Sequence, residues 1–248
     1  MPEGYGFTTD ISAYNPNAIE SCIVQGMRYY EANTSRFQNT LLYTQGYTGG
    51  AGWSIDWSAG IGSSAVIAGF DDVPVTAWYA NTVEKAYNLG LMAGTGGSAF
   101  SPSSNLTIAE AIVLAARVNS ISAGNRAEFP QAAVWYMPYV DYAISENIIN
   151  ADDFDNYGAV ATRAQMAYIF AGALPEDKLE AKNTVSALPD VESDTQYFES
   201  IFVLYHAGVL QGSDSAGTFH PDSGITRAET SAIITRMLDI TERPSFTY

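Results

Sequence analysis

The sequence predicts a mainly α-helical protein built around a repeated unit. Thr107, Thr162 and Thr226 each open the same short pattern, a threonine with Glu or Gln three residues later, and each is followed by an apolar run. The three threonines are 55 and 64 residues apart (162 − 107 and 226 − 162). A recurring spacing of this size is typical of repeats that stack on one another, so we expect three related helical units.

Each of these patterns predicts the start of a helix. Glu110, Gln165 and Glu229 stand three residues after their threonines, which is the spacing of a capping box. In a capping box the two side chains satisfy two backbone N–H groups that the first helical turn leaves free. The apolar residues that follow recur at helical spacing, so one side of each helix should face a core.

Arg163 and Arg227 occupy the first helical position of two of the three units. A cation there is unfavourable by about 0.3–1 kcal/mol, because it lies at the positive end of the helix dipole. Helix N-termini bind anions through free N–H groups. We therefore expect an anion held by the arginine and these N–H groups together. The alternative is a surface arginine paired with a nearby Asp or Glu.

The composition limits the partners. The chain has 248 residues, with 11 Lys plus Arg against 27 Asp plus Glu, so its net charge is −16. Such a surface repels nucleic acid and anionic membranes, and an anionic ligand must be held by individually placed arginines. No apolar run has the length of a membrane span, so we expect no membrane insertion. The low lysine content and the many small polar residues suit a protein that works outside the cell.

No metal site or cofactor is expected. Cys22 is the only cysteine, which excludes an intrachain disulfide and a cysteine-rich zinc site. The acidic stretch 152–156 lacks the glycine and the distal glutamate that a calcium loop needs, so we interpret it as a solvated acidic turn. The start of the chain has neither the basic nor the apolar part of a signal peptide.

Residues 1–68 do not resemble the rest of the chain. Asn15 followed by Pro16 is a good helix start, and apolar spacing extends that helix to about Asn33. Glycines and Trp53 and Trp57 dominate the remainder, which favours loops or short strands. The role of this region stays open, as does its structure, with α+β as one option.

The first and third units share most of their landmarks. We expect Thr76 to cap a helix over 77–89 that Gly90 ends. At an offset of 118 the third unit repeats the positions of Tyr79, Gly90 and Gly94 as Tyr197, Gly208 and Gly212. One inserted residue later, Phe219, Pro221 and Thr226 repeat Phe100, Pro102 and Thr107.

The second unit is degraded. Trp135 matches Trp78, but Asn147 replaces the helix-ending glycine, and 150–161 has lost the pattern of glycine, phenylalanine and proline. Asparagine can still adopt the left-handed conformation. We place linkers at 119–128 and 172–187.

Taken together, Phe-x-Asp-Val, Trp-Tyr, Gly-Leu-x-x-Gly, Phe-x-Pro and Thr-Arg-Ala-Glu resemble the S-layer homology repeat. Three copies span 69–120, 128–174 (degenerate) and 187–240. The resemblance implies a pseudo-threefold helical bundle with one central helix per repeat and three outer prongs.

The resemblance also implies a function: non-covalent anchoring of a surface protein to the cell wall, without enzymatic activity. The implied partner is a secondary cell-wall polysaccharide, with a pyruvylated amino sugar expected, held in grooves between the prongs. The location is then extracellular, at the cell surface or S-layer. The ligand-binding residues would be Arg227, Arg163, Thr226, Glu229, Gly212, Gly94, Trp78, Trp135 and Tyr197.

Within this set the arginines would bind the pyruvate carboxylate, and the two glycines would let a ligand approach the backbone closely. The aromatic residues could equally be core. Ile108 replaces the arginine in the first copy, so a groove that depends on that position should not bind an acid. His206 falls within a helix and is expected to be structural, whereas His220 lies in a turn where it could touch a ligand.

Two other functions stay open from the sequence. The chain could be the anchor-bearing fragment of a cell-surface glycan hydrolase, with carboxylates such as Asp10, Glu20, Glu31 and Asp56 in the first 68 residues. It could instead be a self-assembling S-layer component. New reducing ends in treated wall glycans would indicate the hydrolase, and concentration-dependent self-association would indicate the lattice component.

Overall fold

The structure is a computed structural model and describes residues 69–125 and 128–248. The expectations for residues 1–68, among them the helix at Pro16 and the hydrolase carboxylates, lie outside the described residues. The described part is mainly helical, as predicted, and holds six α-helices and two 3-10 helices but no strand beyond isolated bridging pairs. The elements are α3 (Ala80–Asn88), α4 (Ile108–Ser122), α5 (Met137–Ser145), α6 (Arg163–Gly172), η3 (Glu176–Lys178), α7 (Phe198–His206), α8 (Arg227–Leu238) and η4 (Ile240–Glu242).

The three expected capping boxes are all present. Thr107, Thr162 and Thr226 are the N-caps of α4, α6 and α8, and each side chain accepts a hydrogen bond from the backbone N–H three residues later. The Glu or Gln at that position accepts in turn from the backbone N–H of the threonine. The local sequence thus fixes where these three helices begin.

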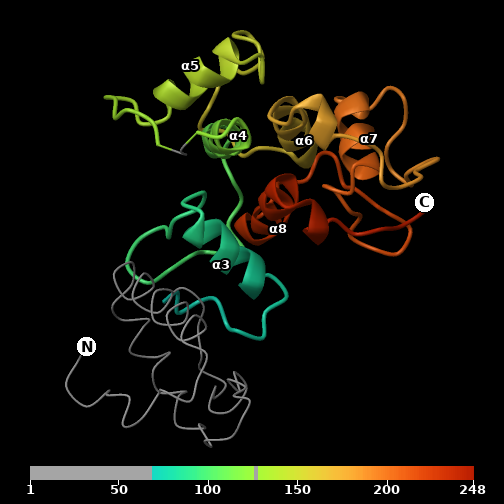
Figure 1. Cartoon of the computed structure of the whole chain (residues 1–248), viewed down its shortest axis with the longest axis horizontal. Helices are drawn as coiled ribbons and strands as arrows, with labels where there is room; N and C mark the ends of the chain where they lie inside the picture. The colour runs from blue at the N-terminus through green and yellow to red at the C-terminus, as the bar shows by residue number, and fades with distance from the viewer. Residues whose placement is uncertain (1–68, 126–127) are drawn as a thin grey trace, which may run out of the picture. The chain divides into compact units, whose positions relative to one another are not determined.

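The helices pack in pairs. The shorter helices α3, α5 and α7 lie against α8, α4 and α6 respectively, and α4 also packs against α6 and α8 (Figure 1). Each short helix therefore covers the long helix of a different copy of the repeated pattern. The pair formed by α3 and α8 joins the first copy to the third.

A closed ring of backbone hydrogen bonds joins the segments that precede the three long helices. The N–H of Leu106 donates to Ile225 O at 2.9 Å, the N–H of Ile225 to Ala161 O at 3.4 Å, and the N–H of Ala161 to Leu106 O at 2.9 Å. All three side chains are fully buried. Because each segment both donates and accepts, each of the three contributes the same two polar groups, one N–H and one carbonyl oxygen.

The short helices end as their sequences predict. Gly90 and Gly208 follow α3 and α7 with φ of +70° and +74°. Asn147, which follows α5, has a φ of +58°. The asparagine therefore replaces the glycine by adopting the same left-handed conformation.

Two expected boundaries are wrong. Thr76 does not cap α3, because the chain first makes turns in which Ala77 and Ala80 donate to carbonyls three residues earlier. The helix begins only at Ala80, after Tyr79, which gives no side-chain cap. The first linker also begins later than residue 119, since α4 continues to Ser122.

The C-terminal segment is held against the helices by Arg243, a buried residue that is 3% exposed. Its guanidinium donates to the carbonyl oxygens of Arg236, Lys178, Ala207 and Met237. Beyond it, Tyr248 exchanges backbone hydrogen bonds with the second linker, donating to Thr184 and accepting from Ser186. The second linker is thus tied down by the C-terminal segment.

Candidate functional site

Arg227 is a buried cation at the first position of α8, with 8% of its surface exposed. Its Nε donates to Phe100 O at 2.8 Å and one terminal nitrogen to Ala93 O at 2.6 Å. The guanidinium carbon lies 4.7 Å from the centre of the Phe100 ring, within cation–π range. An arginine of the third copy is therefore built into the glycine turn of the first.

The charge of Arg227 is not neutralised at close range. Among the described residues no carboxylate lies within ion-pair distance of it. Burial lowers its pKa, and the more distant charges of Glu110 and Asp72 act in the opposite direction. Two of its five N–H donors are used by backbone carbonyls, and the other three (5 − 2) form no hydrogen bond with the described residues.

The amide groups of the helix N-terminus do not take part, contrary to the expectation from the sequence. The N–H groups of Arg227 and Ala228 donate to Ser104 O and Pro102 O, and that of Glu229 donates to the Thr226 hydroxyl. The first amides of α6 are used in the same way. An anion at either site would be held by the guanidinium alone, because neighbouring copies and caps already satisfy the helix ends.

Arg163 has a different electrostatic state. It is 6% exposed, and its Nε donates to Phe219 O while its guanidinium lies 5.1 Å from the Phe219 ring centre. A terminal nitrogen also forms an ion pair with Glu229 at 2.7 Å. The alternative interpretation of a paired arginine is therefore correct for Arg163, although this arginine is buried rather than at the surface and only Glu229 is partly exposed.

The third equivalent position carries no charge. Ile108 begins α4, and the residue that corresponds to Glu229 in the next copy is Gln165. Gln165 keeps the capping box, because an amide oxygen accepts from Thr162 N–H as a carboxylate would. The junction that lost its arginine has thus also lost the matching carboxylate.

Thr226 and Glu229 act first in the helix cap. The Thr226 N–H and hydroxyl both donate to Glu229 Oε2, at 2.9 and 2.6 Å. The other oxygen of Glu229, Oε1, accepts a hydrogen bond from the Arg163 guanidinium. These two residues therefore position the start of α8 and neutralise Arg163.

Gly94 and Gly212 are required by the packing of their own turns. A Cβ at Gly212 would lie 2.3 Å from the backbone of Gly217, and one at Gly94 would lie 2.8 Å from both Ala99 O and the Phe70 ring. The close approach predicted for a ligand is here made by the protein itself. Arg227 still meets this turn, through the carbonyl of Ala93.

The aromatic candidates divide into two groups. Trp78 and Trp135 are 67% and 55% exposed, so neither is a core residue. Each packs edge-on against the tyrosine that follows it, Tyr79 or Tyr136. The contacts of the two arginines include neither tryptophan. Tyr197 is half-buried and belongs to a separate cluster.

That cluster lies where α6 meets α7 and was missed from the sequence. The ring of Tyr168 stacks on Tyr197, with centres 4.6 Å apart and planes inclined by 16°. The Tyr168 hydroxyl donates to Asp153 at 2.5 Å and accepts from the Asn150 amide at 3.2 Å. Asp153 is therefore not part of a freely solvated turn. Alignment of the three capped helices would have given a signal, since Tyr168 replaces Val113 and Ala232.

The two histidines lie in a helix and in a turn, the elements that the sequence predicted for them. His206 is the last residue of α7, and its Nδ1 is 3.1 Å from Asn183 O. His220 lies in the exposed turn of the third copy, with Nε2 3.1 Å from the Ser213 hydroxyl. Within the described residues no group of three or more potential ligands could hold a metal ion.

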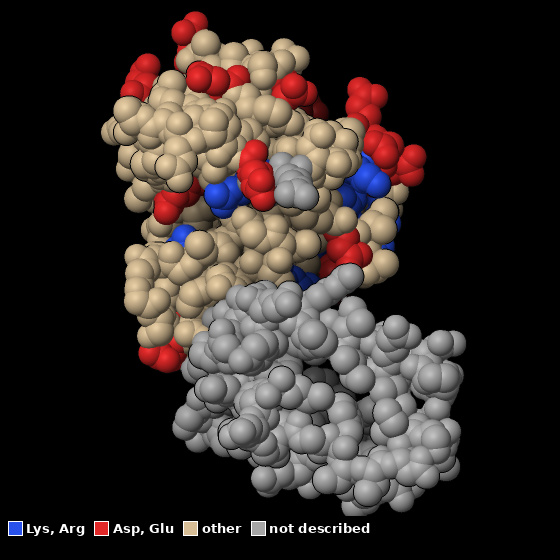
Figure 2. All heavy atoms as spheres, turned by 60° about the vertical axis from the view of Figure 1, so that its left-hand side comes forward, with Lys and Arg blue, Asp and Glu red and all other residues tan. Residues whose placement is uncertain are grey.

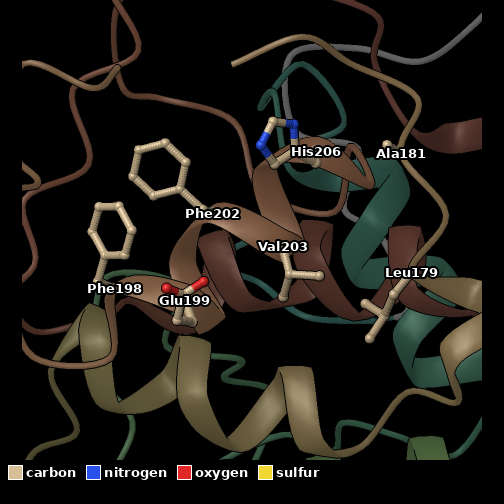
Figure 3. A pocket seen from close by; sticks show the side chains of 7 residues that line it. All are labelled: Leu179, Ala181, Phe198, Glu199, Phe202, Val203 and His206. Carbon is tan, nitrogen blue, oxygen red and sulfur yellow. The ribbon is translucent and has the colours of Figure 1, made fainter. Parts of the chain in front are cut away.

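An apolar hollow follows the outer side of α7 (Figure 3). It contains none of the residues expected to bind ligand and lies apart from both arginine sites. Its lining consists of Leu179, Ala181, Phe198, Glu199, Phe202, Val203 and His206. In the face shown in Figure 2 most of the described surface is uncharged, and acidic side chains are spread over more of it than basic ones. The net charge of −16 likewise disfavours nonspecific binding of an anionic ligand.

The S-layer homology domain is the family that matches this chain, over residues 69–112 and 187–231. These two segments contain the turns whose carbonyl oxygens accept hydrogen bonds from Arg227 and Arg163. The middle copy, residues 128–174, is not part of the match.

A surface-layer relative agrees with that match. Over 186 residues, 72% of this chain, the sequence is 25% identical to an S-layer protein of Bacillus thuringiensis subsp. finitimus. The matched region is 22% of the length of that protein. Both similarities indicate a cell-surface protein with a role in anchoring or in a surface layer. In the described part of the chain, no helix combines the length and apolarity needed to cross a bilayer.

Proposed function

We propose that this chain anchors a larger surface protein to the cell wall by binding a secondary cell-wall polysaccharide that carries pyruvate ketals. In this proposal Arg227 is the principal contact for the pyruvate carboxylate. No catalytic step is involved, and the chain acts by binding alone.

The observation that carries the proposal is the state of Arg227. A buried cation without a carboxylate at ion-pair distance is costly, unless a ligand supplies the missing charge. Arg227 keeps unused N–H donors, and a guanidinium can bind a carboxylate through two parallel hydrogen bonds. Arg163 has the same surroundings but already pairs with Glu229, so we assign it the second place.

The same proposal includes the three-repeat architecture, with repeats at 69–120, 128–174 and 187–240 after an N-terminal region of open role at 1–68. Support comes from the closed ring formed by Leu106, Ala161 and Ile225, to which the middle copy contributes on equal terms. The short helices α3, α5 and α7 would be the prongs. Exposed Trp78 and Trp135 at two prong starts would offer faces for the sugar chain.

Co-sedimentation with bacterial wall sacculi tests the proposal, before and after chemical removal of the secondary polysaccharide. We expect wild-type protein to sediment only with untreated sacculi and Arg227→Ala to bind roughly thirtyfold more weakly or worse, since a desolvated contact of this kind contributes about 2 kcal/mol or more. Leu89→Ala, at an exposed residue that accepts no hydrogen bond from either arginine, is the control for handling. Wild-type protein that ignores untreated sacculi would exclude the anchor, and an unaffected Arg227→Ala would move the acid site elsewhere.

A role as part of a surface lattice is the second candidate, favoured by the S-layer relative. Because the matched region is 22% of that relative, lattice-forming parts would lie outside it. Light scattering of the purified chain over a range of concentrations separates the two roles. A mass that stays monomeric indicates an anchor without lattice contacts of its own.

A further inference from the structure

We propose that the apolar hollow on the outer side of α7 is a docking site for a short amphipathic helix of another protein, which carries lysine or arginine beside its apolar face. The inference goes beyond polysaccharide binding and is independent of it, because the hollow contains none of the residues proposed to bind the polysaccharide. It depends on how the three copies differ at one place and on the hydrogen-bonding groups that line the hollow.

The hollow lies where the chain closes the other two copies by itself. The sixth residue of the short helix is Lys85 in α3, Tyr142 in α5 and Val203 in α7. Lys85 forms an ion pair with Glu242, which follows α8, and Tyr142 packs edge-on against Phe129, which follows α4, with ring centres 5.1 Å apart. Val203 instead lines the hollow, whose volume is about 440 Å³. The third copy therefore leaves open a place that the segment after a long helix covers in the other two.

One side of the hollow is a row of aromatic side chains on α7. Phe198, Phe202 and His206 are spaced four residues apart, so they follow one another along the helix surface. The Phe198 and Phe202 ring centres are 4.4 Å apart, and Leu179 and Ala181, from the segment that follows α6, form the opposite side (Figure 3). A row with this spacing packs into the groove between two rows of another helix, so a helix is the occupant that fits.

The aromatic row belongs to the third copy alone. Where Phe202 stands, α3 has Glu84 and α5 has Asp141. The repeated fold therefore forms with a charged residue at this position and does not require an apolar one. Apolar side chains that gather on a surface without a structural need mark interaction sites.

The polar groups of the hollow favour a partner that donates hydrogen bonds and carries positive charge. Glu199 lines the hollow and forms no hydrogen bond or ion pair with the described residues. His206 Nδ1 lies 3.1 Å from Asn183 O, and since a carbonyl oxygen only accepts, Nε2 of the neutral ring is left as an acceptor. Exposed Glu180 stands between two residues of the lining and adds negative charge.

The chain does not supply this cation itself. Lys178 lies 3.9 Å from Asp177, and Lys182 donates to the carbonyl oxygen of Arg243. A second copy is a poor occupant, because each copy has a net charge of −16 and a helix of nine residues covers far less than the about 800 Å² per partner of a stable interface. A lysine or arginine of a partner helix would lay its apolar stem over the aromatic row and bring its charge to Glu199.

Fluorescence anisotropy of two stapled helical peptides with the full chain tests the proposal. Both peptides carry leucines at helical spacing, flanked by lysines in one and by glutamates in the other. Val203→Lys gives α7 the residue that α3 has and places a cation four residues after Glu199, where the two side chains can pair within the helix. The variant thereby fills and neutralises the hollow, and thermal melting checks that it is folded.

Two charge variants separate the hollow from the overall negative charge. Glu199→Gln removes the carboxylate that lines it, and Glu146→Gln makes the same change at an exposed residue outside it. We expect wild type to bind the lysine peptide at least about tenfold more tightly than the glutamate peptide, and less tightly as salt is added. Val203→Lys should weaken this binding by roughly tenfold or more, Glu199→Gln by about twofold to fivefold, as for an exposed ion pair, and Glu146→Gln should have no effect.

Equal binding of the two peptides by wild type would overturn the proposal, as would equal binding of the lysine peptide by wild type and Val203→Lys. Absence of binding by wild type would also overturn it. A mass that rises with concentration in wild type but stays monomeric in Val203→Lys would assign the hollow to a second copy instead. Val203→Lys should still sediment with wall sacculi as wild type does, so a failure of this proposal is distinguishable from a failure of polysaccharide binding.

Discussion

Replacement of Glu229 by glutamine separates the charge of this residue from its capping role. Glutamine keeps an oxygen that can accept from Thr226, as Gln165 does for Thr162 in α6. The substitution removes only the carboxylate that pairs with Arg163. We expect a less stable protein that has gained a second acid-binding arginine.

The expected size follows from the burial of the pair. Arg163 Nη1 and Glu229 Oε1 are 2.7 Å apart, and the two side chains are 8% and 35% exposed. Loss of one partner from a fully buried pair costs about 3–5 kcal/mol, and exposed pairs contribute about 0.2–1 kcal/mol. For this intermediate case we expect a loss of about 2 kcal/mol. That corresponds to a fall of roughly 4–8 °C in melting temperature for a protein of this size.

Thermal melting with and without pyruvylated wall polysaccharide measures both effects. The ligand should raise the melting temperature of Glu229→Gln more than that of wild type, since a ligand stabilises in proportion to the sites it fills. Gln165→Glu is the matched control, because it makes the reverse chemical change at the equivalent position opposite Ile108, where no arginine stands, and should shift stability by less than about 0.5 kcal/mol. Unchanged melting together with unchanged ligand response in Glu229→Gln would refute the argument that Glu229 neutralises Arg163 while Arg227 stays uncompensated.

Three further outcomes are expected. Gly212→Ala should destabilise the protein by about 1–3 kcal/mol in urea unfolding, because the new Cβ meets backbone at 2.3 Å, whereas Gly158→Ala, which meets only a side-chain atom at 3.4 Å, should be tolerated. Arg243→Met should cost about 3 kcal/mol or more by the same assay, because four carbonyls lose their donor; a smaller loss would mean that water replaces it. The pKa of Tyr168 is raised to about 12 by burial and by Asp153, so its contribution is complete below about pH 10 and is lost as the pH rises toward 12. Between about pH 10 and 12 the free energy of unfolding of wild type should therefore fall by up to about 1 kcal/mol more than that of Tyr168→Phe. This figure is reduced because the ring is partly exposed. Equal losses in the two proteins would contradict this role of Tyr168.

The features that the sequence predicted correctly depend on neighbours within a few residues. A capping box needs only a threonine and a residue three positions later, and all three boxes formed. The left-handed Asn147 likewise follows from its place at a helix end. The start of α3 was wrong because Tyr79 begins that helix without a side-chain cap, so Thr76 was the only local signal.

The partners and charge balance of each arginine could not be predicted from its neighbours in the sequence. Arg227 donates to Phe100 O and Ala93 O, which lie 127 and 134 residues earlier in the chain. Arg163 meets Glu229 across 66 residues. Two arginines in the same motif therefore differ in charge balance because of which copy folds against them, and the exposure of Trp78 and Trp135 was open for the same reason.

The ring formed by Leu106, Ala161 and Ile225 also sets the order in which this domain can fold. The N–H of Leu106 donates to Ile225 O, which lies 119 residues later in the chain (225 − 106). The first copy therefore cannot complete its hydrogen bonds until the last copy has left the ribosome or the export channel. Contacts between distant parts of a chain close slowly, since the entropy of the intervening loop is lost before they form. A chain shortened by its third copy would leave two members of the ring unsatisfied. We therefore expect the three copies to mature together, late and as one cooperative unit.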